Sequence, residues 1–556
     1  MMSMVQRLCT RQFKTIMLSS IVLLTILAIH NRFVVDDAFI SFRYSQNLAG
    51  GKGLVWNEGE LVEGYTNFLW TLLMTIPFFL GIDPVIFSWA AGISISVLTL
   101  WLTFRLASLI LGSRHWGLLA TVLLGTNYSF SAFATSGLET QLQARLFVAC
   151  AYVACDLLRQ GIKDDRVLLL LSLLIALVLL TRLDSGIFVA ITGMFVLFHI
   201  RRREWSGRLR KAATLIVPAA FIIGAWLLWK LSYYHDILPN TFHAKAASLS
   251  TFGLKFYPSF LLTYWLLPFF FLGLAYLYRL IRSASLPQFY LLAAMTAWAM
   301  YVALVGDFME FRMLVPILSF MFIFLAWLIR ESTGTTALRA GMAVVVVLGS
   351  LAHSYSFNGY FETVFKGRYF VSDSVSDLSA DITERRFADI GKTLGELFEY
   401  NQEVTIATGP AGAIPFHAGL RTVDMHGLND LHVNQTGCFR PYYPVTGHKQ
   451  IATLSHLQEQ NVNLVLGGFP DRLRPHAGGG PYTLADLPNL SVEAPPGARI
   501  IEVPLDEGTV IAVLYLNGKA FIDGAIASHG LRTYAMEDQP GGSGQQIAQD
   551  RQMAQD

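Results

Sequence analysis

The sequence predicts an α-helical, polytopic membrane protein that carries a smaller α/β domain at its C-terminal end. Of its 556 residues, 53% are hydrophobic and only 14% are charged, whereas soluble proteins usually contain about 25% charged residues. The mean hydropathy is +0.47. Long apolar runs follow one another up to about residue 354, after which the composition becomes that of a soluble domain. These three observations exclude an ordinary soluble globular protein.

The apolar runs predict about eleven transmembrane helices, since a spanning helix needs roughly 20 mostly apolar residues. The segments are 15–33, 85–111, 116–134, 138–158, 167–182, 185–200, 213–232, 257–278, 288–305, 312–329 and 338–354. The first run follows a basic stretch but is longer than the apolar core of a cleaved signal peptide. We therefore expect an uncleaved first helix.

The segment 65–82 is also apolar, but the basic loops argue against a span there. Lys and Arg collect in cytoplasmic loops, and with a cytoplasmic N-terminus and no span at 65–82, every short basic loop lies on one side. These loops contain Arg7, Arg11, Lys14, Arg105, Arg114, Arg159, Lys163, Arg166, Arg201, Arg202, Arg203, Arg208, Arg210, Lys211, Arg279, Arg282, Arg330 and Arg339. We expect 65–82 to be an interfacial or outer-leaflet helix.

The same topology gathers polar and acidic segments at the extracytoplasmic ends of different helices. They are DDAFISFRY (36–44), VEGYTN (62–67), TSGLET (135–140), TRLDSG (181–186), LPNTFHAK (238–245) and GDFMEFR (306–312). Ionisable residues at membrane depth are costly and usually functional. We therefore predict that the functional site lies on this face.

Asp36 and Asp37 stand where the first helix leaves the membrane. Two carboxylates can act as a general base, position a hydroxyl, or bind a divalent cation such as Mg²⁺, Mn²⁺ or Ca²⁺. Adjacent residues of a helix do not face the same way, so one would be catalytic and the other structural or metal-directed. The alternative is a helix cap or a solvated loop charge.

Residues suited to sugar or acceptor binding follow in the same external segments. Tyr and Asn can both donate and accept hydrogen bonds, as sugar hydroxyls require. The candidates are Glu63, Tyr65, Asn67, Glu139, Arg182, Asp184, Asn240 and Asp307. For Tyr65 the alternative is an interfacial aromatic residue, and for Glu139 and Asp184 it is an ion pair, for example between Arg182 and Asp184.

Three cationic residues, Arg312, Lys245 and His243, are candidates for binding a phosphate. Arginine in particular offers a planar fork that matches phosphate oxygens. The alternative for Arg312 is a side chain that snorkels from the start of a helix.

Residues 355–535 predict an α/β domain, which an odd number of spans places outside the membrane. An amphipathic helix is expected at 382–401 and strands at 403–408, 463–468, 498–504 and 509–516. GPAGAIPFHAGLRTVDMHGLND (409–430) predicts a loop, a helix and a strand that either approach a substrate or simply connect elements. The tail 536–556 has a disordered composition.

Several function classes lose support because their motifs are absent. The sequence has no Walker A, HExxH, GxSxG or dinucleotide-binding GxGxxG signature, so no nucleotide cofactor is expected. The 4 Cys have neither metal-site spacing nor a disulfide framework. The net charge of +2 gives no indication of a nucleic-acid partner.

Taken together, DDAFISFRYSQNLAGGKGLVWNEGELVEGYTNFLW and the later external motifs resemble the GT-C polytopic glycosyltransferases of the AftB-type terminal arabinofuranosyltransferases, in consistent order from about residue 34 to 430. The resemblance implies a GT-C catalytic domain at 1–354 and a polyprenyl-phosphate-linked sugar donor. It assigns the catalytic carboxylate to Asp36 first and Asp37 second, and a donor-phosphate role to Arg312 and Lys245. It also associates the C-terminal domain with a glycan acceptor.

The resulting expectation is an enzyme of the bacterial cytoplasmic (inner) membrane that transfers arabinofuranose to a cell-envelope glycan or glycoprotein acceptor. Alternatives are a polyprenyl-phosphate-mannose or other hexose transferase that acts on protein or lipopolysaccharide, and a lipid-linked-glycan transporter. A transporter predicts mid-membrane charges and helices broken at the bilayer centre, whereas the charges here cluster at outer helix ends.

Overall fold

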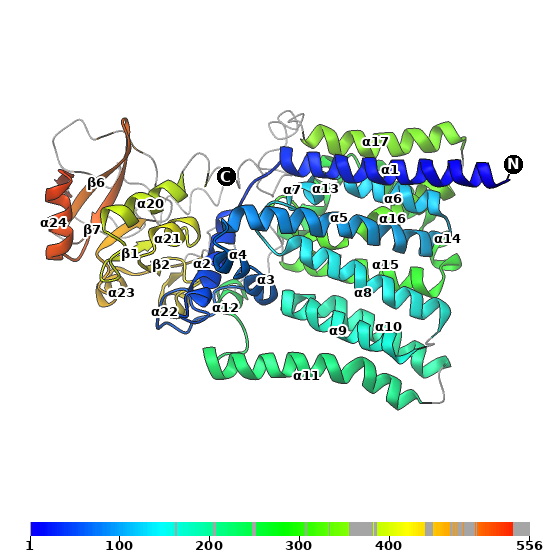
Figure 1. Ribbon diagram of the computed structural model, residues 1–556, viewed down its shortest axis with the longest axis horizontal. Coiled ribbons are helices and arrows are strands. Elements are labelled where there is room, and N and C mark those ends of the chain that lie inside the picture. The colour runs from blue at the N-terminus through cyan, green and yellow to red at the C-terminus, as the bar shows by residue number, and fades with distance from the viewer. Residues whose placement is uncertain are drawn as a thin grey trace.

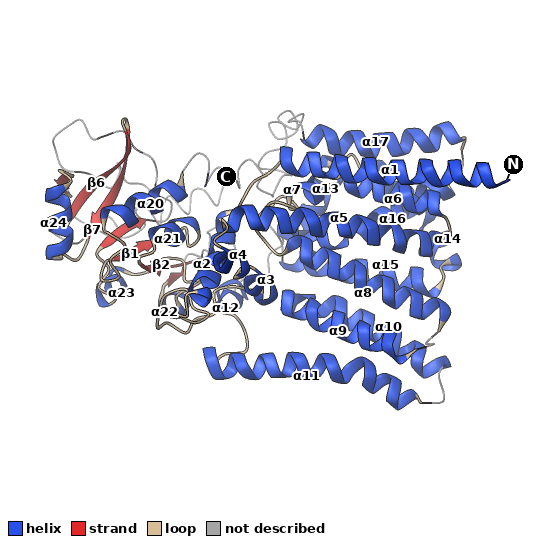
Figure 2. Ribbon diagram, in the orientation of Figure 1, coloured by secondary structure: helices blue, strands red, loops and turns tan. Residues whose placement is uncertain are grey.

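The computed structural model describes residues 2–161, 164–203, 207–246, 252–305, 309–332, 334–354, 386–439, 449–467 and 498–536, together with the single residues 382, 470, 473, 475, 482 and 495. Figure 1 shows a bundle of long helices joined to a separate domain, and Figure 2 shows that the strands are confined to that domain.

Long apolar helices make up the bundle, and they follow one another along the chain. They are α1 (Met2–His30), α5 (Pro84–Leu111), α6 (Arg114–Gly125), α8 (Thr140–Gln160), α9 (Asp165–Thr181), α10 (Gly186–Arg203), α11 (Arg208–Tyr234), α13 (Phe252–Thr263), α14 (Leu267–Ser283), α15 (Leu286–Val305), α16 (Val315–Glu331) and α17 (Thr336–Ser354). Most predicted spans therefore correspond to a helix in the described residues.

The expected number of eleven spans is not confirmed. In the described residues, 8 helices are long and apolar enough to cross a membrane, or up to 9 if α13 and α14, which meet at 110°, count as one. The predicted span 116–134 is interrupted, because Asn127 caps a second short helix, α7 (Tyr128–Ala132), by accepting a hydrogen bond from the Phe130 amide at 3.0 Å. The α9 helix has only 17 residues.

The segment 65–82 forms two short helices, α3 (Phe68–Leu73) and α4 (Ile76–Leu80), of 6 and 5 residues. Neither is long enough to span a bilayer, which agrees with the expectation from the basic loops. Together with α2 (Asp36–Ala49) and α12 (Asn240–Ala246), they lie between the bundle and the C-terminal domain (Figure 1). The α1 helix begins at the opposite end of the bundle (Figure 1).

The C-terminal domain is built on a six-stranded sheet of order β2-β1-β5-β7-β6-β8. The strands are β1 (Thr405–Thr408), β2 (Arg421–Asp424), β5 (Leu464–Gly467), β6 (Arg499–Asp506), β7 (Thr509–Tyr515) and β8 (Arg532–Ala535). The β1 strand pairs in parallel with β2 and β5, and the remaining pairs are antiparallel. All four predicted strands are confirmed.

Helices surround this sheet and connect it to the bundle. They are α20 (Phe387–Leu397), α21 (Ala413–Ala418), α22 (Leu431–Thr436), α23 (Leu454–Glu459) and α24 (Ala520–Ser528), beside a two-stranded ribbon of β3 (Cys438–Phe439) and β4 (Gln450–Ile451). The loop, helix and strand expected at 409–430 are present. The domain boundary at 354/355 and the tail at 536–556 stay predictions, since 355–381 and 537–556 lie outside the described residues.

One buried hydrophobic cluster continues from the bundle into the domain. At the junction, the rings of Phe39 and Phe42 in α2 lie 5.5 and 6.3 Å from the ring of Phe416 in α21. Aromatic pairs at these separations add to the burial of apolar area. The α2 helix therefore holds the C-terminal domain against the membrane bundle.

Candidate functional site

One face of α2 is bound to the C-terminal domain. The carboxylate of Asp36, which is 8% exposed, accepts hydrogen bonds from the amides of Ala413 and Gly412 at 2.7 and 3.1 Å. Two turns further along α2, Arg43 donates to the carbonyl oxygens of Pro415 and Leu420 at 2.5 and 2.8 Å. Positions seven residues apart share a helix face, so Asp36 and Arg43 together hold the loop and helix around α21.

This contact requires a glycine at position 412. A Cβ atom there would lie 1.9 Å from the backbone oxygen of Asp36 and 2.7 Å from its carboxyl carbon. Such a separation is far inside van der Waals contact, and backbone atoms cannot move aside cheaply. The glycines of GPAGA therefore allow the domain to approach α2 closely enough for its amides to reach Asp36.

The neighbouring face of α2 points toward the short helix α3. The Ser41 hydroxyl donates to Asn67 Oδ1 at 3.1 Å, and the Ser45 hydroxyl donates to the carbonyl of Thr71 at 2.7 Å. Asp37 lies one helical turn before Ser41 and so shares this face. Its side chain is half-buried and makes no hydrogen bond or ion pair with another residue of the described segments. The two adjacent carboxylates thus have different surroundings.

Asn67 connects α2 to a buried cluster centred on Glu139. The Glu139 side chain is 1% exposed, and one of its oxygens accepts a hydrogen bond from Asn67 Nδ2 at 2.8 Å. The other oxygen accepts hydrogen bonds from Arg182 Nη1 and Arg312 Nη2 at 2.8 and 2.7 Å. Burial alone would raise the pKa of Glu139, but Arg312 and Arg182 outweigh it and lower the pKa to about 2. Glu139 is therefore a fixed anion that positions two guanidinium groups.

Both arginines have further partners in this cluster. Arg182 Nη2 is paired with Asp184 at 2.6 Å, and the Tyr301 hydroxyl donates to the same carboxylate at 3.0 Å. Arg312 Nε donates to the Thr140 hydroxyl at 3.1 Å. The ion pair between Arg182 and Asp184, which the sequence offered as an alternative to sugar binding, is therefore present. The arginine side chains remain 14% and 13% exposed, and each guanidinium has N–H groups that these partners leave unused, because arginine carries five donors.

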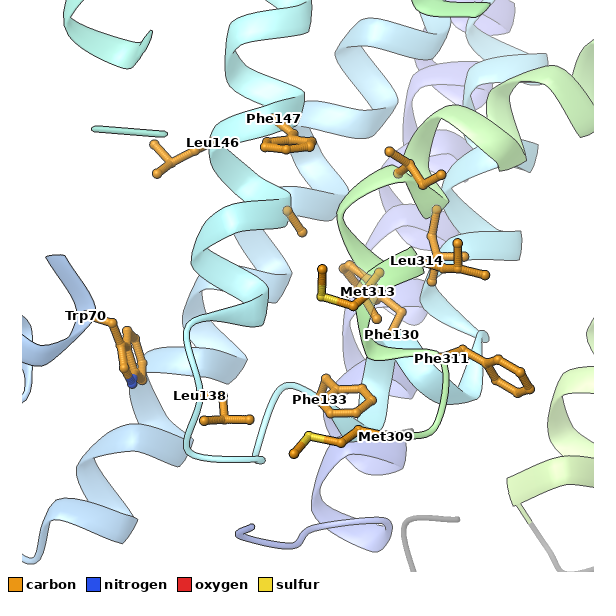
Figure 3. Packing of buried hydrophobic residues seen from close by; sticks show 14 of the residues in the cluster. Trp70, Phe130, Phe133, Leu138, Leu146, Phe147, Met309, Phe311, Met313 and Leu314 are labelled. Carbon is orange, nitrogen blue, oxygen red and sulfur yellow. The ribbon is translucent and has the colours of Figure 1, made fainter. Parts of the chain in front are cut away.

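Hydrophobic packing fixes the two loops that carry Glu139 and Arg312. Figure 3 shows the residues on either side of them, including Leu138, Met309, Phe311 and Met313, in one buried cluster. Trp70 of α3 donates through its indole nitrogen to the carbonyl of Gly137 at 2.9 Å. A substantial rearrangement of the cluster would therefore disturb the hydrophobic core.

Gly137 also lets this loop pass directly over α2. Its φ angle is +82°, and a Cβ atom at this position would lie 2.6 Å from the Cβ of Ala38. Ala38 follows Asp37 in the chain, so the TSGLET loop comes close to the start of α2. The predicted residues Asn67, Glu139, Arg182, Asp184 and Arg312 are thus brought together beside the helix face that carries Asp37.

A second cluster contains Glu63 and Tyr65. Glu63 lies 2.6 Å from Nζ of Lys230, which is completely buried in α11, and Tyr65 shares a hydrogen bond of 3.2 Å with Tyr234. Burial raises the pKa of Glu63 to about 7, although Lys230 opposes this shift. Both predicted residues are occupied by internal partners, so the structure gives them a role in holding the first external loop to α11.

Asn240 lies at the edge of this second cluster and contacts the C-terminal domain. Its amide donates to the carbonyl of Gly427 at 2.8 Å, and Asn434 Nδ2 donates to Asn240 Oδ1 at 2.8 Å. His243, in the same short helix, forms an exposed pair with Asp236 at 3.0 Å. The Lys245 side chain and all of Asp307 lie outside the described residues.

Sequence reasoning missed several buried charges. Lys230 could have been found, because a lysine inside an apolar helix is a strong functional or structural signal. Glu310, two residues before the predicted Arg312, is paired with His353 of α17 at 2.6 Å. Arg43 gave no comparable signal, since its partners are backbone carbonyls of a distant domain.

The pair Asp36 and Asp37 does not fit a shared divalent cation well. Each oxygen of Asp36 accepts a hydrogen bond from an amide of the C-terminal domain. Asp37 lies on a different face of α2, since adjacent residues of a helix do not face the same way, so the two carboxylates do not converge on one ion. Among the described residues, the group of three side chains placed to hold a metal lies elsewhere and includes neither aspartate.

Known proteins with similar architecture identify the fold. The crystal structure of ArnT from Cupriavidus metallidurans bound to undecaprenyl phosphate matches 92% of this chain and 99% of its own, with a TM-score of 0.57 and 13% sequence identity. Its apo structure matches 91% and 98%, with a TM-score of 0.56 and 13% identity. This chain has the GT-C fold. A GT-C chain is a multi-pass membrane protein, in agreement with the apolar helices.

Sequence comparison adds one relative and one domain. A terminal β-(1→2)-arabinofuranosyltransferase from Mycobacterium tuberculosis is 29% identical over 230 residues, which are 39% of this GT-C chain and 35% of that relative. The similarity thus spans about a third of the relative's length. Residues 380–493 match a family described as a domain of unknown function (DUF8728), which covers the sheet domain from before α20 to beyond β5.

Proposed function

We propose that this protein is a glycosyltransferase that moves a sugar from a polyprenyl-phosphate donor to an acceptor hydroxyl at the extracytoplasmic face of the bacterial cytoplasmic membrane. Support comes from the GT-C fold, from the undecaprenyl phosphate bound by ArnT, and from the activity in the name of the mycobacterial relative. No nucleotide cofactor takes part in this proposal.

The observation that carries the proposal is the carboxylate of Asp37, which has no hydrogen-bond or ion-pair partner among the described residues and lies on the face of α2 that leads to the two arginines. Asp37 shares a helix face with Ser41, whose hydroxyl leads through Asn67 to Glu139 and its guanidinium partners. We assign the general base to Asp37, although the family resemblance favoured Asp36 first. The reason is that both oxygens of Asp36 are engaged by backbone amides, whereas Asp37 can accept a proton from an acceptor hydroxyl.

The reaction then follows from the two groups on this face. Asp37 takes the proton of the acceptor hydroxyl, and the oxygen forms a bond to the anomeric carbon of the donor sugar. The bond from that carbon to the phosphate oxygen breaks, and its electron pair leaves with the polyprenyl phosphate. Unused N–H groups of Arg312 and Arg182 stabilise the departing phosphate, since charge-assisted hydrogen bonds of this type are strong.

The charges around Glu139 bear on how the phosphate is held. Arg182 and Arg312 are balanced by Glu139 and Asp184, so the cluster has no excess positive charge. Directed N–H groups, rather than net charge, would therefore select the phosphate. Lys245, predicted for the same role, would add the missing positive charge, and this part stays a prediction because its side chain lies outside the described residues.

Arabinofuranose is the donor sugar that we propose, on the basis of the relative's name, and a cell-envelope glycan or glycoconjugate is the proposed acceptor. The C-terminal domain lies against α2 through Gly412 and Ala413, next to the face that carries Asp37. This contact supports the proposal that the domain guides an acceptor to the site. A hexose donor, or a protein acceptor, would require a different pocket shape but the same base.

The test is sugar transfer by purified full-length protein in detergent, with radiolabelled decaprenyl-phosphoryl-arabinose and a panel of other lipid-linked sugars. Asp37→Asn keeps the size of the side chain and removes the base, and the expected loss in rate is about 10²–10⁴-fold. Asp36→Asn is measured in parallel. Glu58→Gln is the matched control, because Glu58 is an exposed acid of the same external loop that forms a surface ion pair with Lys52.

The two aspartate variants separate the assignments. A large loss with folded Asp37→Asn and a smaller one with Asp36→Asn would support the proposal. The reverse order would restore Asp36 as the base. Transfer from a hexose donor alone would replace the sugar, and no transfer from any donor by the wild type would favour a lipid-linked-glycan transporter.

A further inference from the structure

A cluster of metal-ligating side chains lies in the C-terminal domain, away from the proposed transfer site. His432 of α22 and His456 and Glu459 of α23 each present a ligand atom, and these atoms all lie within 4.8 Å of one another. The two imidazole rings are stacked, with centroids 4.3 Å apart and planes inclined by 11°. His456 and Glu459 are three residues apart on one helix and so share a face.

The buried member of this cluster has an unused ligand atom. His456 is 3% exposed, and its Nδ1 atom has no hydrogen-bond partner among the described residues. A buried polar atom without a partner costs free energy, and a bound ion is one way in which proteins satisfy such an atom. A metal bound by Nδ1 would satisfy this atom.

The other nitrogen of His456 is oriented as in known metal sites. Nε2 lies 3.2 Å from Oδ2 of Asp430, while Oδ1 of Asp430 caps α22 by accepting the Val433 amide at 2.9 Å. Histidine ligands of metals commonly donate their second N–H to a carboxylate, which fixes the ring and raises its basicity. Asp430 therefore fixes both the start of α22 and the orientation of the His456 ring.

We propose that His432, His456 and Glu459 bind a divalent transition-metal ion, with Zn²⁺ as the best match. Two imidazoles and one carboxylate are a common zinc ligand set, with bonds of about 2.0–2.2 Å. Tetrahedral ligands at those bond lengths are roughly 3.3 Å apart, so the site closes on the ion by small movements. His432 and Glu459 are both exposed and free to make them.

The ion would stabilise the side of the C-terminal domain that faces the bundle. It cross-links α22 to α23, and α22 carries Asn434, which donates to Asn240 of α12 at 2.8 Å. Figure 1 shows α22 on the side of the domain that faces α12. We assign the site this structural role, and the sugar transfer proposed above does not depend on it.

The experiment is zinc binding by the purified full-length protein in detergent after treatment with a chelator. Calorimetric titration with Zn²⁺ and metal analysis of the dialysed protein should give one ion per chain, and Zn²⁺ should raise the Tm by several degrees. His432→Ala and Glu459→Gln replace exposed ligands with little effect on folding, and each should weaken the Kd by at least about tenfold.

A second variant tests the orienting carboxylate. Asp430→Asn keeps an amide oxygen that can cap α22 but removes the charge opposite His456, so the expected loss in zinc affinity is about 10–100-fold with a nearly unchanged Tm of the zinc-free protein. His529→Ala, at an exposed histidine beyond α24, and Cys438→Ser, at an exposed thiol, are the controls and should bind like the wild type.

Two results would overturn the proposal. One is the absence of stoichiometric zinc binding by the wild-type protein. The other is binding that survives His432→Ala and Glu459→Gln but is lost in Cys438→Ser or His529→Ala, because the zinc would then be bound at a surface site elsewhere. Neither result affects the transfer assay with Asp37→Asn, so the two proposals can fail separately.

Discussion

At the residue scale, the candidate site shows how one buried anion can organise separate segments of the chain. Glu139 holds Asn67 from the first external loop, Arg182 from the α9–α10 connection and Arg312 from the start of α16. Each of these residues was predicted as a site residue from its position at an external helix end. The structure brings them together, because topology gathers helix ends and a charge buried there needs a partner. Their roles in binding or catalysis stay predictions.

The Glu63–Lys230 pair gives a prediction at the same scale. Glu63→Gln leaves a fully buried ammonium without its partner, and the expected cost is about 3–5 kcal/mol of stability. Lys230→Met should cost less at pH 6, because Glu63, whose pKa is already raised to about 7, can take up a proton and become neutral. The double variant should recover most of the loss. Thermal unfolding in detergent measures all three.

The pH dependence of Lys230→Met follows from the raised pKa of Glu63. A carboxyl group with a raised pKa in the folded state binds a proton more tightly there than in the unfolded chain, so its contribution is lost as the pH rises. Because Lys230 lowers the pKa of Glu63 in the wild type, the carboxyl group of the variant keeps its proton to a higher pH. The variant should therefore lose stability, relative to the wild type, as the pH rises above about 7. Equal stability of all variants at every pH would contradict the buried pairing.

At the element scale, α2 has two faces with different surroundings that the sequence could not separate. The adjacent pair Asp36 and Asp37 was recognised, and helix geometry predicted that the two would point differently. Which of them would be engaged depended on the position of α21, hundreds of residues away in the chain. No local pattern contains that information, because the amides of Gly412 and Ala413 carry no side-chain signal.

Gly412→Ala tests this docking. The added methyl group meets the backbone of Asp36, and overpacking of this kind typically costs about 1–3 kcal/mol. We expect a lower Tm, and a faster cleavage of the C-terminal domain by a protease under native conditions. Gly508→Ala is the matched control, since nothing lies within 4 Å of a Cβ at that position. An unchanged Tm and cleavage rate in Gly412→Ala would show that the two elements are not in close contact.

His417, also in α21, makes the same contact sensitive to acid. Its ring lies 5.4 Å from the ring of Phe39 in α2. Burial, with a smaller effect of Lys392, lowers the pKa of His417 from 6.5 to about 4. A lowered histidine pKa contributes stability above the unfolded value that is lost as the pH falls. The wild type should therefore lose stability from about pH 6.5 toward pH 4, by at most roughly 3 kcal/mol.

His417→Phe keeps an aromatic ring against Phe39 and cannot take up a proton. Its Tm should fall less than that of the wild type when the pH is lowered from 7 to 5, as measured by scanning fluorimetry in detergent. His529→Phe serves as the control at an exposed position. Parallel pH profiles of wild type and His417→Phe would mean that His417 does not limit the acid stability of this junction.

At the scale of the whole molecule, hydropathy and charge predicted the architecture well but not the count of spans. Local periodicity predicted the strands of the C-terminal domain, and the positions of the basic loops predicted that 65–82 does not span the membrane. Neither pattern predicted the interruption of 116–134 by an Asn127 cap or the sharp bend between α13 and α14. Apolar composition continues through both breaks, so a hydropathy pattern cannot reveal them.

The overall arrangement nevertheless makes a firm prediction about membrane sidedness. The α1 helix begins at one end of the bundle, and the C-terminal domain lies at the other (Figure 1). The basic connection that ends in Arg208 and Arg210 lies at the far end of α11 from its Tyr234 terminus, which contacts the first external loop through Tyr65. Since basic loops stay in the cytoplasm, the C-terminal domain should be extracytoplasmic.

Cysteine labelling in intact cells tests this orientation. In a background in which the 4 native cysteines are replaced by Ser or Ala, a single Cys at the exposed Glu507 should react with a membrane-impermeant maleimide. A single Cys at Gly207, in the basic connection before α11, should react only after the membrane is permeabilised. Reaction at Gly207 but not at Glu507 in intact cells would reverse the topology and place the face with Asp37 in the cytoplasm, where an extracytoplasmic acceptor could not reach it.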